Sequence, residues 1–269
     1  MLESQAMPIV KQAEPMPGIT WVDTHAHIHF SNYAGQVDAV LHRAEEADVK
    51  KIITVGINSG DSQKAVELAA TYENIWATVG VHPHEAAEID QGLAYIKDLA
   101  KRRKVVAIGE CGLDFFKNYS SEDDQERALR KQVELAQELN LPVVFHVRDA
   151  FDKFFEIMRD YKVRGVVHSY TADVKTMQKI VERGWLIALN GIMTFSKDDE
   201  HKDLIKQIPD AQLILETDCP FLSPAGFRGK QNEPARVVDI GTFIAEARGS
   251  TIEQLAYSTT KNAERLFGI

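Results

Sequence analysis

The sequence predicts an α/β protein in which eight parallel strands alternate with helices to form a (β/α)8 TIM barrel. Short apolar runs and amphipathic helical patterns alternate from residue 20 to the end, as repeated strand and helix units require. Nearly all of the runs are continuously apolar, which indicates strands buried on both faces. Eight strands with intervening helices fit a single barrel in a chain of 269 residues.

Each element of this barrel has its own segment. The expected strands are 22–28, 50–57, 74–81, 104–110, 141–147, 164–170, 185–191 and 212–218. Between them, apolar stripes with a 3.6-residue period predict helices at 38–48, 61–73, 91–102, 122–140, 151–160, 174–184 and 201–208. The remaining segment, 236–269, is typical of two amphipathic helices separated by RGST. We expect these two helices to cap the barrel.

The main rival fold is a doubly wound open sheet, which needs a glycine-rich phosphate turn after its first strand. Here the first strand is followed by HFSNYAGQ, which contains no such turn. No Ser, Gly or Pro run marks a linker, so we expect one barrel domain over 21–269. Residues 1–20 mix charges and prolines with few apolar residues, and they lack the pattern of a secretory signal. We expect them to form a flexible arm.

Composition narrows the class of protein. No stretch of 18 or more residues is apolar, so a membrane span is not expected. The net charge of −9 argues against coating nucleic acid by bulk electrostatics, so a polyanion would have to be held locally. The candidate cations for this are Lys117, Arg148, Arg228 and Lys230. Cys111 and Cys219 each follow a candidate ligand and are expected to pack as free thiols, which favours a cytoplasmic protein.

Acid and imidazole side chains follow one strand after another. In the first strand, His25 and His27 are two residues apart and therefore point to the same face. Later strands end at Glu110, His146, His168 and Asp218. In a barrel, the carboxyl ends of the strands form the active site. The sequence therefore predicts a metal centre formed by six donors. We expect His29 to contact these ligands at most, and not to bind the ion.

Structural interpretations compete with this one. A single histidine is more often solvated or satisfied by ordinary hydrogen bonds than bound to a metal. His42 and His201, which lie in helical segments, keep that interpretation. A buried carboxylate is harder to dismiss, because an unpaired charge in the interior is costly. Glu110 and Asp218 therefore need a cation, which would be a metal or an arginine such as Arg148.

Seven motifs together carry a resemblance: DTHAHIHF, GVHPHEA, AIGECGLDFF, ELNLPVVFHVRDA, VVHSY, LETDCPFLSP and RGKQNEPARV. In this order they closely resemble the TatD family of metal-dependent deoxyribonucleases, from about residue 21 to 269. The resemblance implies two metal ions bridged by Glu110. One ion would be held by His25, His27 and Asp218, and the other by His146 and His168.

The sequence departs from the family pattern around the second ion. The usual His-Ser-Arg is His146-Val147-Arg148, and the segment after the sixth strand is His168-Ser169-Tyr170-Thr171-Ala172. The second change removes a glycine and adds Tyr170, which we expect to offer an aromatic face to substrate. The ligand histidines are retained, so the departures concern the substrate.

Phosphodiester hydrolysis needs an activated water and neutralisation of charge on phosphate, which two metals about 3.5 to 4 Å apart supply. Mixed nitrogen and oxygen donors suit zinc, manganese or magnesium. Glu110 is expected to bridge the ions, and Asp218 to act as general base as well as ligand. The expected substrate contacts are His82, Arg148 and Arg228. Asp114 and Asn232 are expected to anchor a loop and to cap a helix, with Glu233 structural.

The function that these features predict is a metal-dependent phosphodiester hydrolase. By resemblance it would be a 3′–5′ exonuclease on single-stranded DNA or RNA, with no obligate protein partner. The alternative is a small-molecule amidohydrolase, although such enzymes commonly bridge their metals with a carboxylated lysine where Glu110 stands here. A barrel that binds metal without turnover is the third possibility, which the complete set of buried donors disfavours.

Overall fold

The computed structural model describes residues 18–117, 119–195 and 199–269. Of the arm expected over residues 1–20, residues 1–17 lie outside the described part of the chain. The chain enters its first strand at Trp21. No helix among the described residues has the length and apolar character that crossing a bilayer demands.

The eight strands form one parallel sheet in sequential order, from β1 to β8. They are β1 (Trp21–Ala26), β2 (Val49–Val55), β3 (Ile75–Val79), β4 (Val105–Asp114), β5 (Val143–Arg148), β6 (Gly165–Val167), β7 (Leu186–Leu189) and β8 (Leu213–Leu215). A parallel bridge between Ala26 and Cys219 brings the ends of the sheet together. Next to it, Asp218 N donates to His25 O at 2.8 Å, and His27 N donates to Cys219 O at 2.7 Å. The predicted eight-stranded barrel is therefore confirmed.

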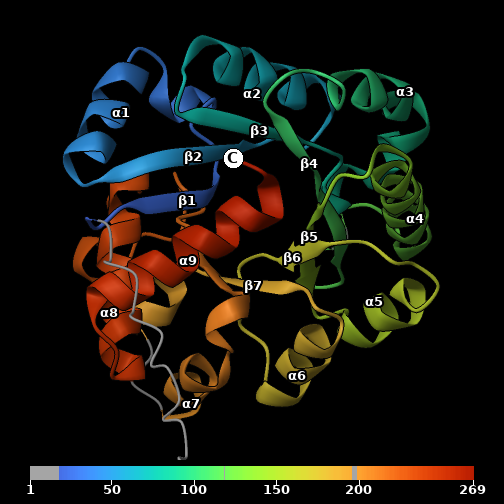
Figure 1. Ribbon diagram of the computed structural model, residues 1–269. Helices are drawn as coiled ribbons and strands as arrows, with labels where there is room; N and C mark the ends of the chain where they lie inside the picture. Colours follow the sequence, from blue (N-terminus) through green and yellow to red (C-terminus); the bar gives the residue numbers. More distant parts are fainter. Residues whose placement is uncertain (1–17, 118, 196–198) are drawn as a thin grey trace, which may run out of the picture.

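Helices surround the strands, as Figure 1 shows. They are α1 (Val37–Glu46), α2 (Ser59–Thr71), α3 (Ile89–Leu99), α4 (Glu122–Leu139), α5 (Phe151–Met158), α6 (Val174–Glu182), α7 (Asp199–Gln207), α8 (Val237–Arg248) and α9 (Ile252–Phe267). Each expected helix is present, with each end within three residues of its expected position. Helix starts carry side-chain caps where the sequence supplies them, as at Thr251, which forms a capping box with Gln254.

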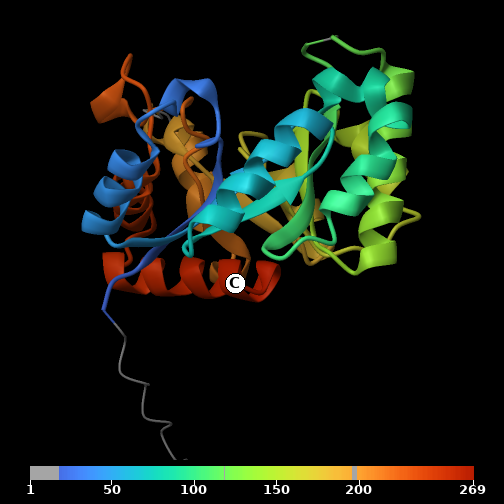
Figure 2. The same cartoon turned by 90° about the horizontal axis from the view of Figure 1, so that it is seen from above.

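The core has two layers. The larger layer lies between the strands and the surrounding helices. The smaller one joins barrel residues such as Val55 and Ile214 to Ala263, Leu266 and Phe267 of α9. Helix α9 therefore closes the amino-terminal end of the barrel, and Figure 2 shows it running across that end.

The expectation that both final helices cap the barrel is wrong for α8. This helix packs against the outer surface of β1 and β8. At Gly241 of α8, an added Cβ would lie 2.5 Å from the ring of Trp21. Glycine is thus needed for the close approach of helix and strand. Helix α8 is the eighth helix of the outer ring, and only α9 is a cap.

Strand β4 also differs from expectation, because it continues to Asp114 instead of ending near Glu110. Its pairing with β5 shifts register between Ile108 and Cys111, so Glu110 lies at an irregularity inside the strand. Such irregularities redirect side chains next to active sites. Here the shift leaves Glu110 directed toward the centre of the barrel, where it contacts four histidines.

Candidate metal centre

The carboxyl ends of the strands surround a cavity of about 700 Å³, and every strand or the loop after it contributes to its lining. Of the predicted ligands, His27, Glu110, His146, His168 and Asp218 line this cavity. His25 is fully buried and contacts them from behind. The structure thus brings all six predicted donors together.

The closure of the barrel places the first group of donors. Because the backbone of Asp218 pairs with that of His25, its carboxylate lies beside both histidines of the first strand. Asp218 Oδ1 is 3.3 Å from His27 Nε2 and 3.6 Å from His25 Nε2. Asp218 has a left-handed backbone with φ of 55°. This conformation costs energy for any residue other than glycine, and residues with such backbone strain are concentrated at functional sites.

Glu110 lies between two groups of imidazoles. Its Oε1 is 2.9 Å from His146 Nδ1 and 2.9 Å from His168 Nε2. Its Oε2 is 3.4 Å from His25 Nε2. Burial raises the pKa of Glu110, but the imidazoles of His168, His82 and His25 outweigh burial and hold the pKa well below its usual value. The ionised carboxylate therefore presents one oxygen to each side of the site.

The hydrogen bonds of the histidines test whether these residues fit a metal. His27 Nδ1 lies 2.8 Å from the carbonyl oxygen of Val55. A carbonyl only accepts, so Nδ1 carries the proton and Nε2 presents a lone pair toward Asp218. His146 Nε2 lies 3.1 Å from Asp114 Oδ2, and a proton donated there leaves the Nδ1 lone pair beside Glu110. Lone pairs and carboxylate oxygens thus converge on the same space.

Converging acceptors need a cation. Neither ring nitrogen of His25 has a hydrogen-bond partner among the described residues, although both are buried. His25, His27 and Glu110 offer ligand atoms within 4.8 Å of one another. The alternative cation, Arg148, forms no salt bridge with a described residue and instead stacks on Phe116. The donors therefore fit divalent metal, and the mixture of imidazole and carboxylate suits zinc, manganese or magnesium.

Two buried carboxylates behind the site were missed from the sequence. Glu216 Oε1 accepts from Ser169 N at 2.7 Å and lies 3.3 Å from His168 Nδ1, while Glu216 Oε2 is 4.0 Å from His25 Nδ1. Glu216 thus faces the ring nitrogens that point away from Glu110. A carboxylate in this position orients a ligand histidine and raises its basicity. The signal in the sequence was the two-residue spacing of Glu216 and Asp218.

The other missed carboxylate is Asp23, which is fully buried. It accepts hydrogen bonds from Thr217 N at 2.9 Å, from Thr217 Oγ1 at 2.6 Å and from His25 N at 3.3 Å. Burial raises the pKa of Asp23 to about 8 despite these bonds. Asp23 ties the first strand to the segment after β8, and so supports the backbone that carries His25 and Asp218.

His82 lies closer to the centre than expected. Its Nε2 is 3.5 Å from Glu110 Oε1, and its Nδ1 accepts a hydrogen bond from His84 N at 3.1 Å. Burial lowers the pKa of His82 to about 4, which leaves the ring neutral at pH 7 with its proton on Nε2. Although His82, Glu110 and His146 also have ligand atoms within 4.8 Å, this tautomer makes His82 a donor at the cavity rather than a ligand.

The remaining histidines have other partners. His29 Nδ1 lies 2.7 Å from Thr54 Oγ1 and its Nε2 lies 2.9 Å from Asp61 Oδ2, so His29 links the segment after β1 to α2. His84 Nε2 contacts Asp114 Oδ2 at 2.9 Å. His42 is exposed on α1, and His201 lies on α7. Neither is near the cavity.

The predicted substrate contacts divide into two groups. His82 and Arg148 line the cavity. Arg228 does not line it; it lies in the loop after β8, 5.6 Å from the ring centroid of Phe195. Lys117 and Lys230 are exposed in the loops after β4 and β8. The expected aromatic face of Tyr170 is wrong, because the ring is 1% exposed and its hydroxyl donates to Asp173 O at 2.6 Å.

One further residue, Asn232, differs in detail from expectation. Asn232 caps no helix through its side chain; its Nδ2 donates to Thr217 O at 2.9 Å and to Phe221 O at 2.7 Å. It therefore holds the segment after β8. Glu233 is structural as expected, since its carboxylate accepts from Arg43 at 2.6 Å. Cys111 and Cys219 are buried free thiols.

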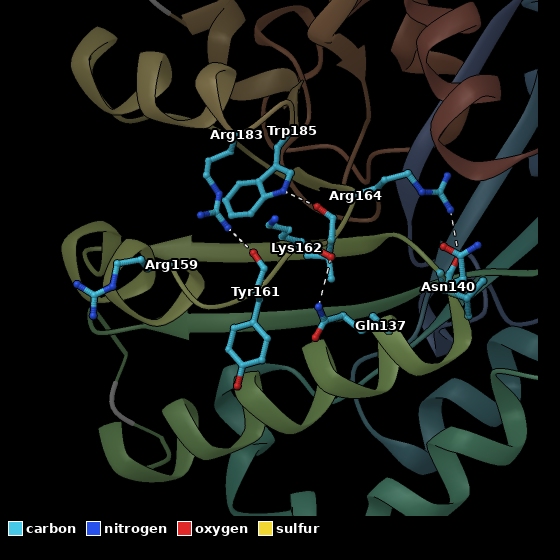
Figure 3. A pocket seen from close by; sticks show the side chains of 11 residues that line it. Gln137, Asn140, Arg159, Tyr161, Lys162, Arg164, Arg183 and Trp185 are labelled. Atoms are coloured by element: carbon cyan, nitrogen blue, oxygen red, sulfur yellow. Dashed lines mark hydrogen bonds between the residues drawn. The ribbon is translucent and has the colours of Figure 1, made fainter.

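A second hollow, of about 600 Å³, lies at the opposite end of the barrel among the turns that lead into β5, β6 and β7. Figure 3 shows two of its arginines, Arg164 and Arg183, directed at backbone carbonyls. Arg183 donates to Tyr161 O at 2.8 Å, and Arg164 donates to Asn140 O at 3.1 Å. These cations hold turns together, and no histidine or carboxylate cluster accompanies them in the described part of the chain.

Comparison with known proteins agrees with this geometry. The family model described as TatD related DNase matches residues 22–268. The chain belongs to this family. An uncharacterised metal-dependent hydrolase of Bacillus subtilis, YabD, is 38% identical over 251 residues, which cover 92% of this chain and 98% of the relative. A relative in Shigella flexneri, named 3′-5′ ssDNA/RNA exonuclease TatD, is 38% identical over 256 residues, with the same two coverages.

Solved structures of TatD proteins show the same architecture. The TatD homologue YJJV of Escherichia coli superposes with a TM-score of 0.87 at 30% identity, covering 93% of this chain and 98% of the other. A TatD family hydrolase of Entamoeba histolytica superposes with a TM-score of 0.85 at 28% identity, with the same coverages. The protein is thus a TatD family metal-dependent hydrolase acting on ester bonds, as the resemblance predicted.

Proposed function

We propose that this protein is a two-metal phosphodiesterase that removes nucleotides from the 3′ end of single-stranded DNA or RNA. The observation that carries the proposal is the position of Glu110, whose two oxygens face different imidazoles at 2.9 Å and 3.4 Å. A carboxylate that bridges two ions needs this arrangement. His25, His27 and Asp218 would hold one ion with Glu110, and His146 and His168 would hold the other.

Two bound divalent ions would supply an activated water and would neutralise charge on the phosphate. Asp218 is the group best placed to take a proton, because it lines the cavity and its contacts with His25 and His27 both involve Oδ1. Burial raises the pKa of Asp218, but the imidazoles of His27, His25 and His168 keep it below its usual value. Asp218 is therefore ionised at neutral pH, as a general base must be.

Substrate would be held by donors around the ligands. His82 directs its Nε2 proton into the site from the side of Glu110, where it could donate to a phosphate oxygen. Arg148 brings a guanidinium with no carboxylate partner among the described residues, which suits a phosphate. The name of the Shigella relative supports a nucleic-acid substrate with this polarity.

The test is hydrolysis by the protein loaded with Mn²⁺, Mg²⁺ or Zn²⁺. Single-stranded DNA labelled at its 5′ end, the same sequence as RNA, and a bis(p-nitrophenyl) phosphate surrogate would be compared with hydantoin and amide substrates. We expect a ladder of products shortened from the 3′ end. Cleavage of the C–N substrates alone would instead support the amidohydrolase alternative.

A further inference from the structure

Exposed aromatic rings gather at the mouth of the barrel. Among the described residues, the large apolar side chains that are exposed are Tyr95, Phe116, Tyr119, Phe195, Phe221 and Tyr257. Four of these six follow strands at the cavity end: Phe116 and Tyr119 after β4, Phe195 after β7 and Phe221 after β8. Exposed apolar surface that is concentrated beside a polar cavity indicates a binding surface.

The first ring, Phe116, is held in a fixed position. Its N–H donates to Asp114 Oδ1 at 3.0 Å, and the other oxygen of Asp114 contacts His146. The Cζ of Arg148 lies 3.8 Å from the centroid of the Phe116 ring, so the guanidinium stacks on it. Phe116 is nevertheless 54% exposed. The ring and the guanidinium stacked on it, called here the Phe116–Arg148 platform, are tied through Asp114 to a predicted metal ligand.

The second ring, Phe221, stands across the cavity. Strands β4 and β8 are four positions apart in an eight-stranded barrel, so the loops that follow them face each other. Phe221 lines the cavity and is 51% exposed. Its N–H donates to Asp218 O at 3.0 Å, and its ring lies 6.3 Å from that of Phe30. Phe221 is thus fixed relative to Asp218, as Phe116 is relative to His146.

We propose that the Phe116–Arg148 platform and Phe221 each stack one unpaired base of the strand whose phosphate enters the cavity, with Arg148 also binding a neighbouring phosphate. This inference rests on the proposed function. Every base has a face that can stack on an aromatic ring, so such a clamp tolerates any sequence. Paired bases in a duplex stack on one another, so the clamp selects single strands.

The net charge of the protein favours binding through base stacking over binding through neutralisation of phosphates. Binding by phosphate neutralisation requires many cations and weakens steeply with salt. This chain has a net charge of −9, and among the described residues that line the cavity only Arg148 is a lysine or arginine. Stacked bases would supply affinity that the charge cannot. The competing occupant of these rings is a protein partner. Kinetics on intact and abasic strands distinguish a protein partner from a nucleic-acid strand.

The test is a double-mutant cycle in which the aromatic ring is removed from the enzyme and the base is removed from the substrate, separately and together. Kinetics of the manganese-loaded enzyme are measured on a single-stranded oligonucleotide and on one whose three 3′-terminal residues are abasic. On the intact strand, Phe116→Ala and Phe221→Ala should each raise KM by ~5- to 140-fold, which corresponds to 1–3 kcal/mol per stacked base. On the abasic strand, the same substitutions should raise KM less than threefold, because the partner of the ring is already gone.

Controls separate stacking from other effects of the substitutions. Tyr95→Ala and Tyr257→Ala remove exposed rings from α3 and α9, away from the cavity, and should change KM on either strand less than twofold. Phe116→Trp should retain the affinity for the intact strand. The thermal midpoint of each variant is measured as well, since these rings are exposed and their loss should not unfold the barrel.

Several outcomes would overturn the clamp. Equal losses on intact and abasic strands would mean that the ring only shapes its loop. Variants that match the wild type on the intact strand but change its sedimentation would assign the rings to a protein interface. Both results leave the proposed function standing, because the wild type still degrades the intact strand. A wild type that cleaves neither strand would instead defeat the proposed function, and the clamp with it.

Discussion

Asp114 Oδ2 lies 3.1 Å from His146 Nε2, on the side of the imidazole opposite Glu110. The same carboxylate accepts from Phe116 N at 3.0 Å and from Lys117 N at 2.9 Å. Burial raises the pKa of Asp114, but the contact with His146, the hydrogen bond from Lys117 N and the contact with His84 outweigh burial and lower it. Asp114 therefore does more than anchor a loop: it orients a predicted ligand.

Asp114→Ala should weaken binding of the ion on the His146 side. Loss of a carboxylate that orients a ligand histidine typically costs ~10- to 100-fold in metal affinity. The two N–H groups left without an acceptor should also lower the free energy of unfolding by about 1–3 kcal/mol. Metal titration against a chromophoric chelator, together with denaturant unfolding of the metal-free protein, measures both effects.

Asp61→Ala is the matched control, because Asp61 pairs with His29, which is not a predicted ligand. It should lower stability and leave metal affinity within about twofold. Equal loss of metal affinity in both variants would show that general destabilisation, rather than orientation of His146, explains the result.

Glu110→Ala should abolish turnover and lower the occupancy of both ions, because one oxygen faces each side of the site. His168→Ala should deplete mainly one ion, since His168 Nε2 contacts only the Oε1 side. Metals per chain, counted by mass spectrometry of the purified variants, give the answer. Two ions and a near-normal rate in Glu110→Ala would show that the carboxylate does not bridge.

Asp218→Asn tests the assignment of the general base. The amide keeps an oxygen donor and a similar volume but takes up no proton near neutral pH. We expect kcat to fall by ~10²-fold or more, with most of the metal retained. Asp114→Asn, measured at equal metal content, is the comparison that should lose less in kcat. Comparable activity of Asp218→Asn and the wild type would leave Asp218 as a ligand only.

The periodicity of the sequence was sufficient to predict the barrel. Continuous apolar runs specify strands buried on both faces, and the spacing of His25 and His27 specifies a shared direction. Both are local properties, and the structure agrees with them. The position of Glu110 inside β4 depends instead on a register shift against β5. The register between β4 and β5 could not be predicted from the residues of either strand alone.

Contacts between distant segments explain the other differences. Tyr170 was expected to face substrate, but the hydroxyl bond to Asp173 and the packing of the core bury it. Glu216 was overlooked because its partners, His25 and His168, come from other strands. The sequence predicted both α8 and α9 as amphipathic helices, and their different packing shows which one caps the barrel.

Glu216→Gln tests whether the carboxylate behind the site tunes its ligands. Burial lowers the pKa of His168, and the carboxylates of Glu110 and Glu216 outweigh burial and raise it well above its usual value. Glutamine can still accept from Ser169 N and Asn190 Nδ2, so the local hydrogen bonds and the fold should persist. Removing the charge should make the imidazole less basic and lower metal affinity by ~10- to 100-fold.

Glu233→Gln provides the control for this last variant, because Glu233 is also a buried carboxylate but pairs with Arg43 outside the site. It should change stability without changing metal affinity. The two variants would be titrated with Zn²⁺ and Mn²⁺ in competition with a chelator. If Glu216→Gln bound both metals as tightly as Glu233→Gln did, Glu216 would only support the backbone of Ser169, and the basicity of His168 would be set by Glu110.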